Sequence, residues 1–234
     1  MKAYLLRAGL VSLALGVSLA ASDGRAQPAA GGAAPGGDAA VAKALKPLPK
    51  KEKEAPKLTK KTTVRFQTTA GEIVIDVFPD AAPNAAQRFI ELVRSGFYDD
   101  TPISRVVPGF VAQFGVNWRE PHKAWKEKKF ADDPTYFALE RGTLAFAKAG
   151  ANTNSTQVFI NYAQNNRLAD PRYNFTVFGE VVSGMDVVDK FARVGDPSNG
   201  LDQDRLWQDG GAYIESLAEK PTMITHATVV DAAQ

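Results

Sequence analysis

One permanently charged side chain stands in an otherwise mostly apolar stretch, residues 103–115, which read ISRVVPGFVAQFG. The charge belongs to Arg105, and a guanidinium stays protonated and offers several hydrogen-bond donors in a fixed plane. In a partly dry cleft such donors stabilise developing charge far more strongly than they do in water. Two interpretations follow. Arg105 either extends its charge to solvent over apolar neighbours, as arginines at strand ends commonly do, or acts on a bound substrate.

Other catalytic patterns are missing from the sequence. The two histidines are His122 and His226, and neither has a His, Asp or Glu at a recognised metal-ligand spacing. The chain has no cysteine, no G-x-S-x-G nucleophile motif and no glycine-rich phosphate loop. The sequence therefore gives little support to a hydrolase or a metalloenzyme, and we expect no cofactor.

Short alternating segments dominate the part of the chain that must position Arg105. Residues 63–79 alternate on both sides of Ala70-Gly71, which predicts a β-hairpin with Gly71 at positive φ. Many short strands with only two helices indicate a closed barrel or a sandwich. Further strands are predicted at 105–107, 109–115, 142–149, 156–162, 175–182 and 223–230, and helices at 83–95 and 184–194.

The first 26 residues have the layout of a secretory signal peptide. A positive start is followed by a mostly apolar run from Ala8 to Ala21 and then by small residues up to Ala26. That run is too short for a comfortable membrane span, and an exported chain without cysteine fits the periplasm. We therefore expect cleavage near Gln27, a periplasmic location and no stable membrane insertion of the mature chain. An uncleaved anchor is the alternative.

Residues 27–61 differ in composition from the rest of the chain, because they are first rich in Ala, Gly and Pro and then in Lys and Pro. Neither half has an apolar period that would offset the entropy cost of ordering it. We interpret this stretch as a disordered tether. Between Lys43 and Lys61 it has eight lysines against two glutamates, whereas residues 62–234, the predicted domain, carry 17 Lys and Arg against 22 Asp and Glu. The acidic domain argues against nucleic acid as the main partner.

Four stretches together resemble the cyclophilins, the cyclosporin-binding class of peptidyl-prolyl cis/trans isomerases. They are the opening hairpin, residues 103–115, GTLAFAKAGANTNSTQVFI at 142–160 and FTVFGEVVSGMDVVDKF at 175–191. The resemblance runs from about residue 63 to 230 and follows the order and spacing of the family. It implies a mainly β fold, a closed eight-stranded antiparallel β-barrel capped by two α-helices, and we expect a monomer.

The resemblance also implies roles for individual residues. The catalytic arginine of the family falls on Arg105, and its two cleft glutamines fall on Gln113 and Gln157. The other matched positions form the apolar pocket for proline, at Phe110, Val111, Phe159, Leu168 and Phe175, and the backbone track that holds the substrate, at Ala147, Lys148 and Ala149.

Several positions depart from the family pattern. Val111 stands where the family has a methionine, Lys148 replaces the usual asparagine of the track, and Arg167 replaces the tryptophan that many members use to contact cyclosporin. We expect the Lys148 side chain to be exposed, since only its backbone is needed, and cyclosporin binding to be weak. Residues 117–141 and 195–216 do not follow the common pattern and resemble a divergent bacterial branch.

The implied reaction needs no proton transfer and no covalent intermediate. An X–Pro bond isomerises over tens of seconds unaided, because amide resonance is lost while the bond twists. The family role makes Arg105 the donor to the twisted amide and Gln113 the group that orients it. A substrate peptide would pair with the track like an added strand. The expected partners are proline-containing segments of unfolded polypeptides or loops.

We therefore expect an exported prolyl isomerase that assists the folding of other exported proteins. The alternative is a cyclophilin-like peptide-binding module or chaperone with weak or no isomerase activity. Turnover on a short proline peptide separates the two. A third interpretation, a cell-wall scaffold that uses the basic tether, would show salt-sensitive binding to envelope fractions.

Overall fold

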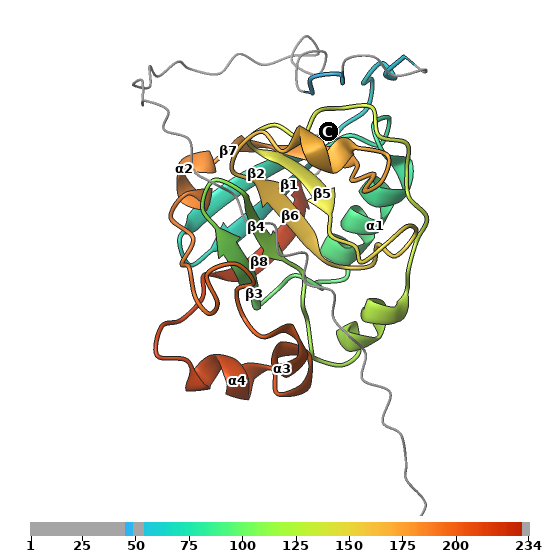
Figure 1. Ribbon diagram of the computed structural model, residues 1–234. Helices are drawn as coiled ribbons and strands as arrows, with labels where there is room; N and C mark the ends of the chain where they lie inside the picture. Colours follow the sequence, from blue (N-terminus) through green and yellow to red (C-terminus); the bar gives the residue numbers. More distant parts are fainter. Residues whose placement is uncertain (1–44, 49–53, 231–234) are drawn as a thin grey trace, which may run out of the picture. The chain divides into compact units, whose positions relative to one another are not determined.

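A computed structural model describes residues 45–48 and 54–230 of the chain, and these residues form a closed antiparallel β-barrel (Figure 1). Around the barrel the strands follow the order β1-β2-β7-β5-β6-β4-β3-β8. The predicted signal peptide lies outside the described residues. The strands are β1 (Thr62–Thr68), β2 (Gly71–Val77), β3 (Thr101–Val107), β4 (Val111–Phe114), β5 (Thr143–Phe146), β6 (Val158–Asn161), β7 (Val177–Ser183) and β8 (Met223–Val230).

The opening hairpin forms as its alternation predicts. Strands β1 and β2 pair from Thr62 opposite Val77 to Thr68 opposite Gly71. Gly71 has a φ of 135°, which suits glycine at this turn, and Thr68 Oγ1 donates a hydrogen bond to the Gly71 carbonyl at 2.6 Å. The predicted barrel is confirmed, including the antiparallel direction of its strand pairs.

Helix α1 (Pro83–Arg94) packs against the barrel through one apolar face. Proline suits its first turn, but Ala82 before it provides no side-chain cap. The capping oxygens come instead from Asp133, whose carboxylate accepts the N–H groups of Asn84 and Ala85 at 3.2 and 2.9 Å. Burial raises the pKa of Asp133, and these two hydrogen bonds oppose the rise. The buried residues of the helix are Ala85, Ala86, Phe89, Leu92 and Val93.

The second predicted helix is much shorter than expected. Helix α2 (Met185–Val188) makes one turn, after which hydrogen bonds of i to i+3 spacing tighten the chain and turn Phe191 into the core. Two further short helices, α3 (Gln203–Gln208) and α4 (Gly211–Ser216), were not predicted and lie together outside the barrel (Figure 1). Their core consists of Val116, Val194, Leu201, Leu206, Trp207 and Tyr213.

Strands β4 and β6 have apolar residues on both faces. Ala112 and Phe114 of β4 point into the barrel, where Phe114 meets the ring of Phe66 edge-on at 5.6 Å between centroids. Val111 and Phe159 belong to a second apolar cluster on the outer face. Since successive side chains of a strand point to opposite faces, the same strands close the barrel and build an outer apolar surface.

Part of the predicted tether packs on the barrel, so the expectation of disorder is wrong for the described residues between 45 and 61. Leu45 is 7% exposed and belongs to the outer apolar cluster. The backbone of Lys46 and Leu48 bonds to Ala138 and Tyr136, at 2.7 and 2.9 Å. A single leucine needs no apolar period to be buried, which is why composition did not reveal this contact.

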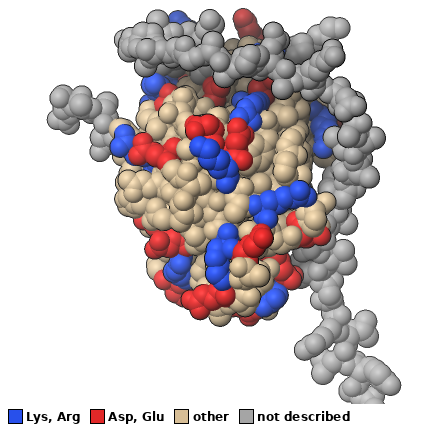
Figure 2. Space-filling view, turned by 90° about the vertical axis from the view of Figure 1, so that its left-hand side faces the viewer, with Lys and Arg blue, Asp and Glu red and all other residues tan. Residues whose placement is uncertain are grey.

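Charged residues of both signs are interspersed on the face of the molecule shown in Figure 2, where neither sign forms a continuous patch. Among the described helices, none has the length and apolar character needed to cross a membrane.

We predict that Leu45→Ala lowers the free energy of unfolding of the whole chain by about 1–3 kcal/mol, because it removes a buried side chain and leaves a gap in the outer cluster. Urea unfolding measures the change. Lys57→Ala, an exposed position of the same segment, is the matched control and should change little. Equal stability of the Leu45 variant and the wild type would contradict the packing described here.

Candidate functional site

Three predicted site residues lie in one row across neighbouring strands. Arg105 of β3 is directly opposite Gln113 of β4, and Gln113 is directly opposite Phe159 of β6. Residues directly opposite in an antiparallel pair place their Cβ atoms about 5 Å apart on the same face. Strand register alone therefore brings a cation, an amide and an aromatic ring together on the outside of the barrel.

Neutral acceptors hold the guanidinium of Arg105. Its Nε donates to the Ser198 carbonyl at 2.7 Å, and its Nη1 lies 3.5 Å from Gln113 Oε1. The guanidinium also lies over the ring of Phe110, 5.6 Å from the centroid. Burial lowers the pKa of Arg105, yet an arginine remains charged throughout the physiological range. The site thus presents a fixed, partly desolvated cation.

The loop that carries Ser198 approaches Arg105 closely. The Asp196 carboxylate accepts the N–H groups of Ser198 and Asn199, at 2.9 and 2.8 Å, and shapes the turn. Gly200 has a φ of 72°, and a Cβ there would lie 2.3 Å from the Ser104 carbonyl oxygen. Only glycine permits this approach. Sequence reasoning missed Ser198 because its contribution is a backbone carbonyl.

The two glutamines form a chain with Arg105. Gln113 Nε2 donates to Gln157 Oε1 at 2.8 Å, which leaves Gln113 Oε1 facing the guanidinium. Each amide therefore has a defined orientation, and the chain reaches from β3 across β4 to the segment before β6.

The predicted pocket residues share the outer apolar cluster. Val111 and Phe159 form its buried part, at 2% and 4% exposure, while Phe110, Leu168 and Phe175 are partly exposed. Phe175 meets Phe159 edge-on, with 5.6 Å between ring centroids. The structure therefore brings all five residues together as an apolar floor with an accessible rim.

Two asparagines, Asn161 and Asn165, hold the backbone of the rim at Phe110. Asn165 Nδ2 donates to the Phe110 carbonyl at 3.0 Å and to Asn161 Oδ1 at 2.8 Å. The Phe175 N–H donates to the Leu168 carbonyl at 3.0 Å, so this hydrogen bond joins the two ends of the loop between residues 168 and 175. These polar groups are satisfied internally, which holds the exposed rings in place.

Arg167 approaches the same ring as Arg105. Its guanidinium lies 5.4 Å from the centroid of Phe110, so two cations contact one aromatic side chain. Arg167, which the resemblance aligns with the cyclosporin-contacting tryptophan, therefore lies beside the apolar floor.

Within the predicted backbone track, Lys148 is the residue whose two backbone polar groups are both unengaged among the described residues. The Ala147 N–H donates to the Gln157 carbonyl at 2.8 Å, and the Ala149 N–H donates to Thr153 Oγ1 at 3.0 Å. Neither the N–H nor the carbonyl of Lys148 has a hydrogen-bond partner among the described residues. Lys148 therefore presents a free donor and a free acceptor at this edge.

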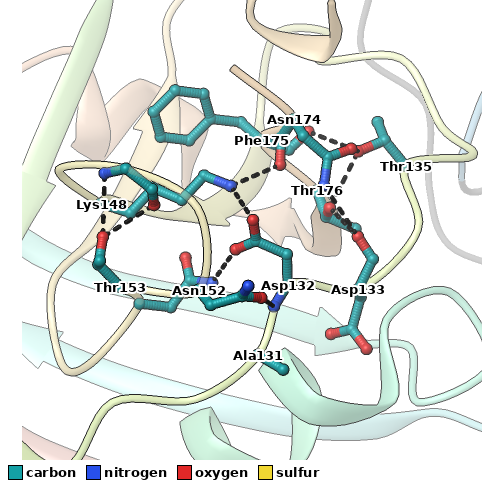
Figure 3. A network of polar contacts seen from close by, with 12 residues as sticks. Ala131, Asp132, Asp133, Thr135, Lys148, Asn152, Thr153, Asn174, Phe175 and Thr176 are labelled. Carbon is teal, nitrogen blue, oxygen red and sulfur yellow. Dashed lines mark hydrogen bonds and ion pairs between the residues drawn. The ribbon is translucent and has the colours of Figure 1, made fainter. Parts of the chain in front are cut away.

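The expectation that the Lys148 side chain is exposed is wrong. The side chain is 4% exposed, and its Nζ lies 2.6 Å from Asp132 Oδ2 (Figure 3). Sequence reasoning missed Asp132, which lies in the segment that departs from the family pattern. A lysine in place of the family asparagine was the available signal, because a buried ammonium needs an anionic partner.

Comparison with solved structures identifies the fold. Among solved structures, a cyclophilin type peptidyl-prolyl cis-trans isomerase of Cryptosporidium parvum matches with a TM-score of 0.57 at 21% identity, covering 74% of this chain and all of that one. A crystal structure of the same protein in the presence of the dipeptide Ala-Pro matches with a TM-score of 0.55, also at 21% identity, over 73% of this chain and 99% of that one. The fold is therefore that of the cyclophilins.

Sequence comparison then identifies the family. The model of the cyclophilin type peptidyl-prolyl cis-trans isomerases matches residues 63–209. Peptidyl-prolyl cis-trans isomerase B of Escherichia coli (strain K12) is 39% identical over 163 residues, which cover 66% of this chain and 97% of that protein. A peptidyl-prolyl cis-trans isomerase of Acinetobacter baylyi is 38% identical over 148 residues, 61% of this chain and 78% of the other. The chain belongs to the cyclophilin type peptidyl-prolyl cis-trans isomerase family.

Proposed function

We propose that the chain catalyses cis/trans isomerisation of X–Pro bonds in exported polypeptides, with Arg105 as the catalytic residue. The observation that supports this proposal most directly is the row of Arg105, Gln113 and Phe159 across three strands. It sets a fixed cation beside an apolar floor, which is the combination that a twisting prolyl amide requires.

The chemistry follows from the barrier to rotation. Twisting an X–Pro bond breaks amide resonance, so the nitrogen becomes pyramidal and gains electron density. A guanidinium N–H directed at that nitrogen stabilises the twisted state more than the planar one, and only such a difference raises the rate. Gln113 orients the guanidinium, and Ser198 holds its Nε, so the donor is in position before the amide twists.

Substrate binding uses the remaining predicted residues. The proline ring rests on Phe110, Val111, Phe159, Leu168 and Phe175, and the peptide backbone pairs with the free N–H and carbonyl of Lys148. The solved relative studied with Ala-Pro supports a proline-containing ligand for this fold. The apolar floor and the Lys148 backbone bind planar and twisted substrate alike, so they contribute to affinity. The rate enhancement depends on Arg105.

Arg105→Ala should lower kcat/KM on a short proline peptide by on the order of 10²–10³, because it removes one charged donor that acts in the twisted state. The fold should survive, since no carboxylate among the described residues pairs with this arginine. Arg105→Lys keeps the charge without the planar fork and should recover part of the rate. An isomerase assay with a melting curve for each variant decides. Near-normal turnover by a folded Arg105→Ala protein would make Arg105 a surface residue without a catalytic role, whereas absence of turnover in the wild type would favour a peptide-binding module.

Weak binding of cyclosporin is the second expectation. Arg167 places a second guanidinium over Phe110, where an aromatic anchor would otherwise contact an apolar drug. Loss of such an anchor commonly costs about 2 kcal/mol or more. Calorimetric titration should therefore show tighter binding for Arg167→Trp than for the wild type. Nanomolar affinity of the wild type would refute this account.

The exported location rests on the first 26 residues, whose order of positive, apolar and small residues is that of a signal peptide. N-terminal sequencing of the protein from a periplasmic extract should find a start near Gln27. A chain that retains Met1 and sediments with membranes would contradict export by cleavage.

A further inference from the structure

The ammonium group of Lys148 lies between the Asp132 carboxylate and the Asn174 carbonyl (Figure 3). Its Nζ contacts Asp132 Oδ2 at 2.6 Å and donates to the Asn174 carbonyl at 3.0 Å. The side chains of Lys148 and Asp132 are 4% and 13% exposed. The residue as a whole is nevertheless half-buried, so solvent reaches mainly its backbone. The side chain therefore anchors a backbone that faces outward.

Asp132 is itself held in place. Its Oδ1 accepts a hydrogen bond from Asn154 Nδ2 at 2.7 Å, and its N–H donates to Asn152 Oδ1 at 2.9 Å. Asn152 has a φ of 57°, which marks the turn after the track. Both oxygens of the carboxylate and its backbone are thus engaged, and the ion pair has one geometry.

The Lys148 ammonium also contacts Phe175, one of the residues of the apolar floor. Asn174, whose carbonyl it bonds, immediately precedes Phe175, and the Nζ lies 5.6 Å from the centroid of the Phe175 ring. Asn174 has a φ of 48°, and its Oδ1 accepts a hydrogen bond from Thr135 Oγ1 at 2.8 Å. One side chain thus connects the free backbone edge to the ring that packs on Phe159.

We propose that the Lys148–Asp132 ion pair positions both peptide-binding elements of the site, the free backbone edge of Lys148 and the ring of Phe175. Lys148 is in this role a positioning residue, because its ammonium acts through the backbone and Phe175 and does not touch the substrate. The inference rests on the proposed function in one respect, that the ligand is a proline-containing peptide.

The expected signature is a loss of affinity without a loss of turnover. The backbone edge and Phe175 bind planar and twisted substrate alike, so misplacing them weakens both states equally. A change that removes such uniform binding raises KM and leaves kcat nearly constant. A pair that only stabilises the fold would lower the melting temperature and leave KM unchanged at temperatures well below the transition.

The experiment uses the full mature chain and an Ala-Pro-containing tetrapeptide. Lys148→Met keeps the unbranched stem but removes the charge, and Lys148→Met with Asp132→Asn also removes the buried carboxylate that the single variant would leave unpaired. We expect the double variant to fold and to bind the peptide about tenfold more weakly, with kcat within about twofold of the wild type. NMR titration gives the dissociation constant directly, and exchange spectroscopy at saturation gives turnover.

The control is a second lysine–aspartate pair on the barrel, in which the aspartate is buried and the lysine is 40% exposed. Lys61 lies 2.9 Å from Asp76 on the opening hairpin, away from the site. Lys61→Met with Asp76→Asn makes the same chemical change there and should leave peptide affinity unchanged.

Because binding is measured apart from turnover, the two proposals fail separately. A wild type that binds the peptide without isomerising it would overturn the proposed isomerase activity. Peptide binding that still depends on Lys148 would then support the positioning role in a peptide-binding module. Wild-type affinity in a folded double variant, equal weakening by the Lys61 control, or no peptide binding by the wild type would each overturn the positioning role.

Discussion

Strands β4 and β6 carry apolar side chains on both faces, and both the barrel and the site depend on this arrangement. Their inward side chains, such as Phe114 and Ile160, close the barrel, while Val111 and Phe159 form the floor of the site outside it. A shift of register by one residue would exchange the two sets and destroy both. Barrel closure thus also fixes Gln113, which shares the outward face. The precision of the site comes from strand register more than from its loops.

The loops around the site are fixed by a different physical rule. They contribute apolar side chains to the floor, but buried polar groups with internal partners fix the course of their backbone. The Asn165 amide fixes the backbone of Phe110, and the Asp132 carboxylate fixes Lys148. Gly200 allows a third loop to bring a carbonyl against Arg105. Each of these contacts joins segments that are distant in sequence, and each is directional, so the loops have defined positions.

This difference explains what the sequence could predict. Period-two alternation located the strands, and Gly71 marked the first turn, because both signals are local. The site residues were matched by resemblance, but their row across β3, β4 and β6 depends on register. Helices α3 and α4 have six residues each, and their stability comes from a small core of their own, which no local pattern specifies. Lys148 was misjudged because its partner Asp132 lies 16 residues away at no characteristic spacing.

The two cations of the site, Arg105 and Lys148, differ in whether an anion neutralises their charge. Lys148 is deeply enclosed, and a carboxylate at 2.6 Å neutralises it, so its field hardly extends to a ligand. Arg105 is only partly desolvated, and among the described residues its hydrogen bonds go to a carbonyl and an amide oxygen, which orient the guanidinium without cancelling its charge. Exchanging the arrangements would be costly, because a carboxylate beside Arg105 would compete with the electron-rich nitrogen of a twisting amide. The ion-paired cation therefore suits positioning, and the cation with neutral partners suits stabilisation of charge that develops in the substrate.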